Sequence, residues 1–77
     1  MPKLAAVRRR KLLTQRELAE RAGVALSTLY AIETGRHQPQ MRIIRKIAAA
    51  LEVDPLEVDE FRRTVAPDES EQRQAAA

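Results

Sequence analysis

The stretch from residue 26 to residue 34 has the residue types needed to contact a nucleic acid. Its spacing predicts a helix, Leu26–Glu33, whose apolar Leu29 and Ile32 point toward a core. At 100° per residue, the opposite face then carries small or uncharged side chains, namely Ser27, Tyr30, Ala31 and Thr34. An exposed helical face without Lys or Glu is poorly suited to solubility alone. Its hydroxyl and methyl groups suit contact with base edges in a DNA groove.

A second candidate contact lies at the start of the preceding helical segment. Gln15 and Arg16 open that segment, where free backbone N–H groups can meet a phosphate. Gly23 provides the short turn that lets the two helices cross with close backbones. The pattern favours DNA binding, and the alternative is a helical hairpin whose small residues pack against a protein partner.

The sequence offers few residues of the types that carry out catalysis or bind metal ions. The chain has no Cys and one His, and its only serines are Ser27 and Ser70, so no nucleophile–base–acid set is visible. We therefore expect no enzymatic activity, no metal and no cofactor. His37 could act as a titratable phosphate contact. The alternative is an exposed loop histidine without a role.

The charge is distributed unevenly along the 77 residues, which are enough for one small domain. Residues 1–46 carry eleven Lys/Arg and three acids, a net charge of +8, whereas residues 47–77 carry three Lys/Arg and eight acids, a net charge of −5. A basic half in a chain with a pI of about 10.0 is typical of a polyanion binder, although a solvated charged surface would also explain it.

No apolar run is long enough to span a bilayer, and no signal peptide opens the chain. We expect a soluble, cytoplasmic and nucleoid-associated protein without membrane contact.

Apolar residues recur at spacings of three and four, which predicts an all-α chain. The first segment begins near Pro2 and ends near Leu12. Thr14 and Glu17 have the spacing of a capping box, so the next helix begins at Gln15, and it stops at Gly23.

The sequence pattern in the second half of the chain predicts two further helices and a tail. After the loop that contains Pro39, the fourth helix covers about 41–51, with an inward stripe of Met41, Ile44, Ile47, Ala48 and Leu51. The fifth opens at Asp54-Pro55-Leu56-Glu57 and runs to about Arg63. We assign residues 1–65 to one domain and residues 66–77 to a disordered tail. A protein partner could order part of that tail, residues 69–77, into a helix.

The residues quoted above resemble a known family. Residues 14–24 look like the first helix and turn, and residues 27–36 like the recognition helix and loop, of the Cro and phage-repressor type of helix-turn-helix, also called the xenobiotic-response-element family. The resemblance extends over about residues 4–61. It implies a five-helix, lambda-repressor-like fold whose second and third helices form the motif, with the third in the major groove of DNA.

The resemblance also implies roles for individual residues. The set that would face the bases is Leu26, Ser27, Thr28, Tyr30 and Ala31. The set that would contact phosphates is Gln15, Arg16, Arg36, His37, Gln38 and Arg42. Arg8 and Glu33 would form a structural ion pair, and the alternative for Arg8 is a place in the solvated basic face beside Arg9 and Arg10.

Three positions depart from the family pattern. Leu12 stands where the family often has glycine, which implies a strained turn that costs on the order of 1 kcal/mol. Ala25 replaces the usual Ser or Thr cap of the recognition helix, with a loss of about 1 kcal/mol. Leu26 cannot form a hydrogen bond with a base, so it would contact a thymine methyl or simply pack.

A single recognition helix reads few base pairs, so tight binding usually needs two half-sites. We therefore expect a homodimer with a seam on the fifth helix, formed by Leu56, Val58, Phe61 and Val65. The alternative is that these residues complete the monomer's own core.

The function predicted from these observations is sequence-specific binding of double-stranded DNA by a transcriptional regulator. Repression of a palindromic operator is the commoner use of such a bare domain. Two alternatives remain: an antitoxin or controller protein of a two-gene system, with the tail as a partner segment, and a protein-interaction adaptor with the same fold. RNA binding is disfavoured because Tyr30 and Phe61 are the only aromatic residues.

Overall fold

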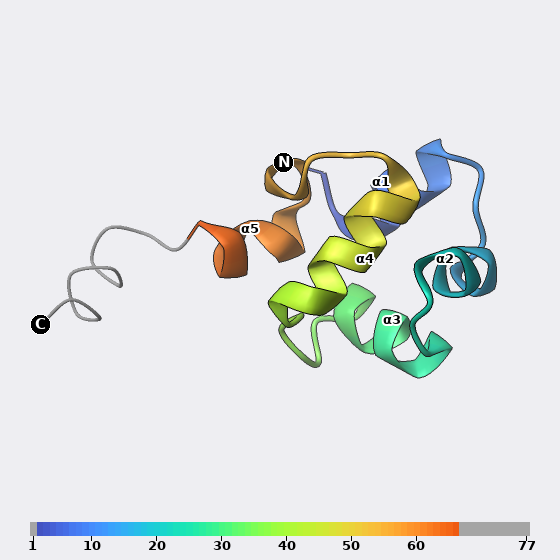
Figure 1. Cartoon of the computed structure of the whole chain (residues 1–77), viewed down its shortest axis with the longest axis horizontal. Coiled ribbons are helices and arrows are strands. Elements are labelled where there is room, and N and C mark those ends of the chain that lie inside the picture. The colour runs from blue at the N-terminus through green and yellow to red at the C-terminus, as the bar shows by residue number, and fades with distance from the viewer. Residues whose placement is uncertain (1, 67–77) are drawn as a thin grey trace, which may run out of the picture.

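The computed structural model describes residues 2–66, and these residues form an all-α domain (Figure 1). The element order is α1 (Leu4–Arg10), α2 (Gln15–Ala22), α3 (Leu26–Glu33), α4 (Met41–Leu51), a short 3₁₀ turn η1 (Pro55–Glu57) and α5 (Asp59–Val65). The predicted fold class, with five α-helices in this part of the chain, is therefore confirmed. The predicted disordered tail of residues 66–77 lies, apart from Ala66, outside the described residues.

Local hydrogen bonds define where α2 begins and ends. The Glu17 amide donates to Thr14 Oγ1 at 3.0 Å, and the Thr14 amide donates to Glu17 Oε1 at 2.9 Å, which confirms the capping box. These bonds from the backbone and side chain of Thr14 lower the pKa of the Glu17 carboxyl. At the other end of α2, Gly23 adopts a left-handed conformation with φ of +70°.

The turn between α1 and α2 depends on a leucine in an unfavourable conformation. Leu12 has φ of +61°, in the left-handed region, and 89% of its surface is exposed. α1 ends at Arg10 rather than at the predicted Leu12, because the chain leaves the helical conformation there. The strain expected at this position is present, and no burial of the leucine side chain offsets it.

α3 lacks a side-chain cap, as expected from Ala25, which makes no capping hydrogen bond. Two fully buried side chains on its inner face, Leu29 and Ile32, hold it to the core instead. Their burial is worth about 1.5–3 kcal/mol each, more than the missing cap would add.

The core is formed by apolar side chains from all five helices and the connecting segments. α2 packs against α3 and α4, and the largest fully buried residues are Leu4, Leu18, Leu29, Ile44, Ile47, Leu51, Val58 and Phe61. One member of the predicted stripe on α4 is placed differently. Met41 is 52% exposed, because it lies in the first turn of α4, beyond the edge of the core.

The predicted fifth helix is interrupted. Asp54 accepts a hydrogen bond from the Leu56 amide at 2.9 Å and caps η1, but the chain is extended at Val58 before α5 begins at Asp59. At this break the side chain of Val58 is completely buried. The single helix from Pro55 to Arg63 that the sequence predicted is therefore two short elements.

The same region corrects the predicted dimer seam. Val58 and Phe61 are 0% exposed within one chain, so they belong to the monomer's own core and cannot meet a second copy. A domain this small needs its few large apolar residues inside, which explains the error. Leu56 is 40% exposed, and Val65 is half-buried against the core.

Residues 2–4 are fastened to the start of α5. The Asp59 amide donates to the Pro2 carbonyl at 2.9 Å, and the Leu4 amide donates to Glu60 Oε1 at 2.8 Å. Lys3 Nζ lies 2.8 Å from Asp59 Oδ2. The hydrogen bond and charge of this ion pair lower the pKa of Asp59 and raise the pKa of Lys3. We refer to these three contacts as the N-terminal clasp.

We expect Leu12→Gly to raise the free energy of unfolding by about 1 kcal/mol, because glycine adopts positive φ without a Cβ penalty and little burial is lost. Urea denaturation followed by circular dichroism measures the change. Leu12→Ala is the matched control, since alanine keeps the strain. A glycine variant no more stable than the alanine variant would contradict the argument.

We expect the N-terminal clasp to weaken in acid. The folded-state pKa of Asp59 is lowered relative to its ordinary value of 3.8, so the Lys3–Asp59 pair within the clasp stabilises the fold above about pH 4, and this contribution is lost as pH falls through the folded pKa. Melting temperatures measured from pH 7 to pH 2 should fall less steeply in Asp59→Asn. Lys3→Met should flatten the dependence of melting temperature on pH in the same way, because the ion pair with Lys3 is what lowers the pKa of Asp59. Wild-type slopes in both variants would refute this explanation.

Candidate nucleic-acid interface

A groove lies between α3, the α3–α4 loop and the first turn of α4. Its volume is about 490 Å³. The residues that line it are Ser27, Thr28, Ala31, Ile32, His37, Gln38, Pro39, Gln40, Arg42 and Ile43. Six of these ten belong to the sets predicted for base and phosphate contact, so the fold brings residues that are up to fifteen positions apart onto one surface.

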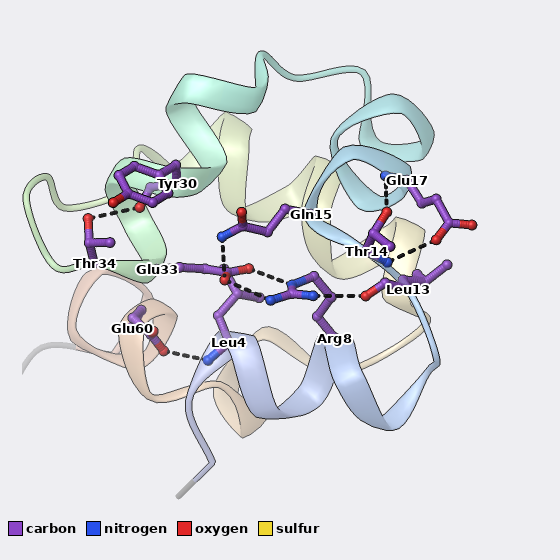
Figure 2. A network of polar contacts seen from close by, with 10 residues as sticks. All are labelled: Leu4, Arg8, Leu13, Thr14, Gln15, Glu17, Tyr30, Glu33, Thr34 and Glu60. Atoms are coloured by element: carbon purple, nitrogen blue, oxygen red, sulfur yellow. Dashed lines mark hydrogen bonds and ion pairs between the residues drawn. The ribbon is translucent and has the colours of Figure 1, made fainter.

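The outer face of α3 has the composition expected from the sequence. Ser27, Leu26 and Tyr30 are exposed, and Thr28 and Ala31 are half-buried. Thr34 lies at the end of this face, but its hydroxyl donates to the Tyr30 carbonyl at 2.9 Å (Figure 2). The hydroxyl groups of Ser27 and Thr28 have no such partner in the described part of the chain, and both residues line the groove.

The predicted phosphate contacts fall into two groups. His37, Gln38 and Arg42 line the groove beside α3. Arg36 lies outside the groove lining, with its guanidinium carbon 5.9 Å from the centre of the Tyr30 ring, at the outer limit of a cation–π contact. Gln15 and Arg16 belong to the first turn of α2 and do not line the groove either.

Arg8 and Glu33 form a buried ion pair (Figure 2). Arg8 Nε donates to Glu33 Oε2 at 2.8 Å, and Arg8 Nη2 donates to Glu33 Oε1 at 3.1 Å. The side chains are only 9% and 5% exposed. A third bond runs from Arg8 Nη1 to the Leu13 carbonyl at 2.9 Å, so each of the three guanidinium nitrogens donates a hydrogen bond. Arg8 is therefore not part of the solvated basic face.

The same carboxylate has a partner that the sequence did not indicate. Gln15 Nε2 donates to Glu33 Oε1 at 3.0 Å, so the glutamine predicted to hold a phosphate is also bonded to the end of α3. The capping box placed Gln15 at the first position of α2. Nothing in the local sequence shows which way its side chain turns, because its partner is 18 residues away.

The charges of residues 2–66 are distributed unevenly over the elements, with exceptions at Glu17 and Glu20 on α2 and at Arg62 and Arg63 on α5. The exposed cations at the ends of α1 and α2, in the α3–α4 loop and on α4 all come from the basic half of the sequence, whereas the acids Glu52, Asp54, Glu57, Asp59 and Glu60 occupy the segment from the end of α4 to α5. The groove contains Arg42 and no acidic residue. An anionic ligand is therefore favoured there.

Within residues 2–66, no group of three or more His, Cys, Asp or Glu side chains is placed to hold a metal ion. None of the helices in this range is both long and apolar enough to cross a bilayer.

Comparison with known proteins identifies the family to which this domain belongs. The family model for helix-turn-helix proteins matches residues 4–58, which is most of the chain. The chain belongs to the Cro and phage-repressor type of helix-turn-helix family. In this helix-turn-helix domain, α2, the turn at Gly23 and α3 form the motif, and the fold is of the lambda-repressor type.

The helix-turn-helix domain also resembles a curated protein from Methanothermobacter thermautotrophicus (strain Delta H) named as an uncharacterized HTH-type transcriptional regulator. The two are 51% identical over 39 residues, which cover 51% of this chain. The matched region spans 56% of the relative's length. No solved structure matches the domain significantly.

We expect Arg8→Ala to destabilise the domain by about 3–5 kcal/mol, because it leaves the Glu33 carboxylate buried without its cation. That loss is comparable with the whole stability of a small domain. Replacement of both partners, Arg8→Met with Glu33→Met, should recover most of it, since no buried charge remains. Urea denaturation measures both. A double variant no more stable than Arg8→Ala would show that the buried charge is not the cause.

Proposed function

We propose that this domain binds double-stranded DNA sequence-specifically, with α3 in the major groove. One observation carries the proposal: Ser27, Thr28 and Ala31 of the uncharged outer face of α3 line the same groove as Arg42 in the first turn of α4, and the groove contains no acidic residue. A major groove about 12 Å wide admits a single α-helix. Cations beside such a helix would meet the phosphates that border the groove.

In this arrangement α3 supplies the base contacts. Ser27 and Thr28 offer hydroxyl groups that can donate to or accept from base edges, and Ala31 offers a methyl group to thymine. Leu26 and Tyr30 are the exposed apolar members of the set and would contact thymine methyls or flanking sugars. The phosphate contacts come from the first turn of α2, the α3–α4 loop and the first turn of α4; the residues are Gln15, Arg16, Arg36, His37, Gln38 and Arg42.

We further propose that the domain regulates transcription, and that it represses by occupying a palindromic operator as a dimer. Support for regulation comes from the family and from the name of the relative in Methanothermobacter. The dimer rests on energetics, because one helix contacts too few bases for typical operator affinity. Leu56 and Val65 are the members of the expected seam that remain accessible for it. Such a regulator would act in the cellular compartment that holds the genome.

Selection of bound duplexes from a randomised pool at about 150 mM salt tests the proposal. An enriched inverted repeat, with half-site centres about one helical turn apart, is the expected result. Enrichment of a single half-site would retain specific binding but reject the dimer. If no motif emerged, sequence-specific binding would be wrong, and the adaptor or the partner-dependent antitoxin would become the better description.

On the selected operator, we expect Arg42→Ala to lower affinity and to reduce the slope of log Kd against log salt by about 1, because one phosphate contact is lost. Arg10→Ala is the matched control, since Arg10 is an exposed cation on α1 that does not line the groove. Fluorescence anisotropy from 50 to 300 mM salt would give both slopes. Equal slopes in the two variants would remove Arg42 from the interface.

A further inference from the structure

The carboxamide of Gln15 lies at the junction of the two helices of the motif. Gln15 is the first residue of α2 and Glu33 is the last residue of α3, and the hydrogen bond between their side chains is 3.0 Å long. Gln15 is half-buried, so part of its side chain still reaches solvent. The bond therefore ties the start of α2 to α3 without enclosing the glutamine.

Glutamine has more hydrogen-bonding capacity than this bond uses. A carboxamide has two N–H donors and a carbonyl oxygen with two lone pairs, and Glu33 occupies one donor. The second N–H and the carbonyl have no partner in the described part of the chain. The backbone amides of Gln15 and Arg16 are likewise without one, whereas the Glu17 amide is bonded to Thr14.

Glu33 is a rigid anchor for that bond. Two hydrogen bonds from Arg8 hold its carboxylate, and Arg8 in turn donates to the Leu13 carbonyl (Figure 2). Oε1 of Glu33 accepts from both Arg8 and Gln15. A long side chain held by such an anchor has already lost rotamer freedom, so it would lose less on binding a ligand.

We propose that Glu33 is a positioning residue for DNA binding, and that it acts through Gln15. Glu33 holds one N–H of the Gln15 carboxamide, and this leaves the second N–H ready to donate to a backbone phosphate at the start of α2. The inference rests on the proposed function, because it takes DNA as the ligand. It adds that a carboxylate which never touches DNA sets part of the affinity.

A purely structural role for Glu33 makes a different prediction. If the ion pair only held α1 against α3, its replacement by a packed apolar pair would leave the Gln15 contact with DNA unchanged. If Glu33 acts through Gln15, the same replacement would remove the benefit of the glutamine. Coupling between the two sites therefore separates the roles.

A double-mutant cycle on the selected operator at about 150 mM salt measures this coupling. The four proteins are wild type, Gln15→Ala, Arg8→Met/Glu33→Met, and the triple variant. We expect Gln15→Ala to weaken binding about tenfold, the value for loss of one hydrogen bond to a charged group. The apolar pair should weaken binding by a similar factor, and the triple variant should be within about twofold of the apolar pair.

Side-chain amide NMR of the wild-type protein gives a second readout that does not need the apolar variant to fold. On titration with operator DNA, the Gln15 N–H that points away from Glu33 should shift strongly, while the N–H bonded to Glu33 should shift little.

Three outcomes would overturn the inference. Effects that multiply in the triple variant, to about a hundredfold, would mean that Glu33 does not act through Gln15. Wild-type affinity in a folded Arg8→Met/Glu33→Met protein, or equal shifts of the two Gln15 amide protons, would give Glu33 a structural role alone. If the wild-type protein selects no DNA sequence, the proposed function itself is wrong. This failure can be told apart from failure of the inference, because the selection uses the wild-type protein alone and comes before any variant is tested.

Discussion

The buried ion pair between Arg8 and Glu33 is the contact on which the arrangement of the motif depends. Removing two charges from water is costly, and the pair is tolerable because each buried nitrogen and oxygen atom of the two side chains has a hydrogen-bond partner. The Leu13 carbonyl accepts from Arg8 and the Gln15 carboxamide donates to Glu33, so α1, the α1–α2 turn, α2 and α3 meet at this ion pair. Because these contacts fix the orientation of α3 from the side of the core, the outer face of α3 is not needed to hold the helix in place.

A limited supply of large apolar residues shapes the rest of the domain. Within residues 2–66, fourteen hydrophobic residues are buried, among them the single Phe of the sequence, and the large hydrophobic residues that stay exposed there are Leu12, Leu26, Tyr30, Met41 and Leu56. The groove instead combines the hydroxyl groups of Ser27 and Thr28, polar loop side chains and Arg42 with a smaller number of apolar side chains. A surface of that kind is poorly suited to hydrophobic association but well suited to a polar, hydrated ligand such as the edge of a base pair.

Most of the fold could be predicted from local sequence, because caps and glycines act within a few residues. Thr14, Glu17 and Gly23 located α2, and the spacing of Leu29 and Ile32 gave the outer face of α3. The Arg8–Glu33 pair was implied only by family resemblance. Features that depend on distant partners were missed: the bond from Gln15 to Glu33, and the burial of Val58 and Phe61, which is decided by the volume that the other helices leave open. Met41 was misplaced for a related reason, since periodicity alone does not show where the core ends.

The N-terminal clasp has a consequence for the order in which the domain forms. Leu4 and Glu60 are 56 residues apart in the chain, as are Lys3 and Asp59, and these two bonds span the longest separation among the side-chain hydrogen bonds described. α1 to α4 precede Val58 and Phe61 in the chain, so the apolar surfaces that these two cover stay open to water until the segment after α4 has packed. The closing of the core by α5 and its fastening to residues 2–4 are thus one late event. A chain shortened before residue 61 would therefore expose part of its apolar core rather than form a smaller working domain.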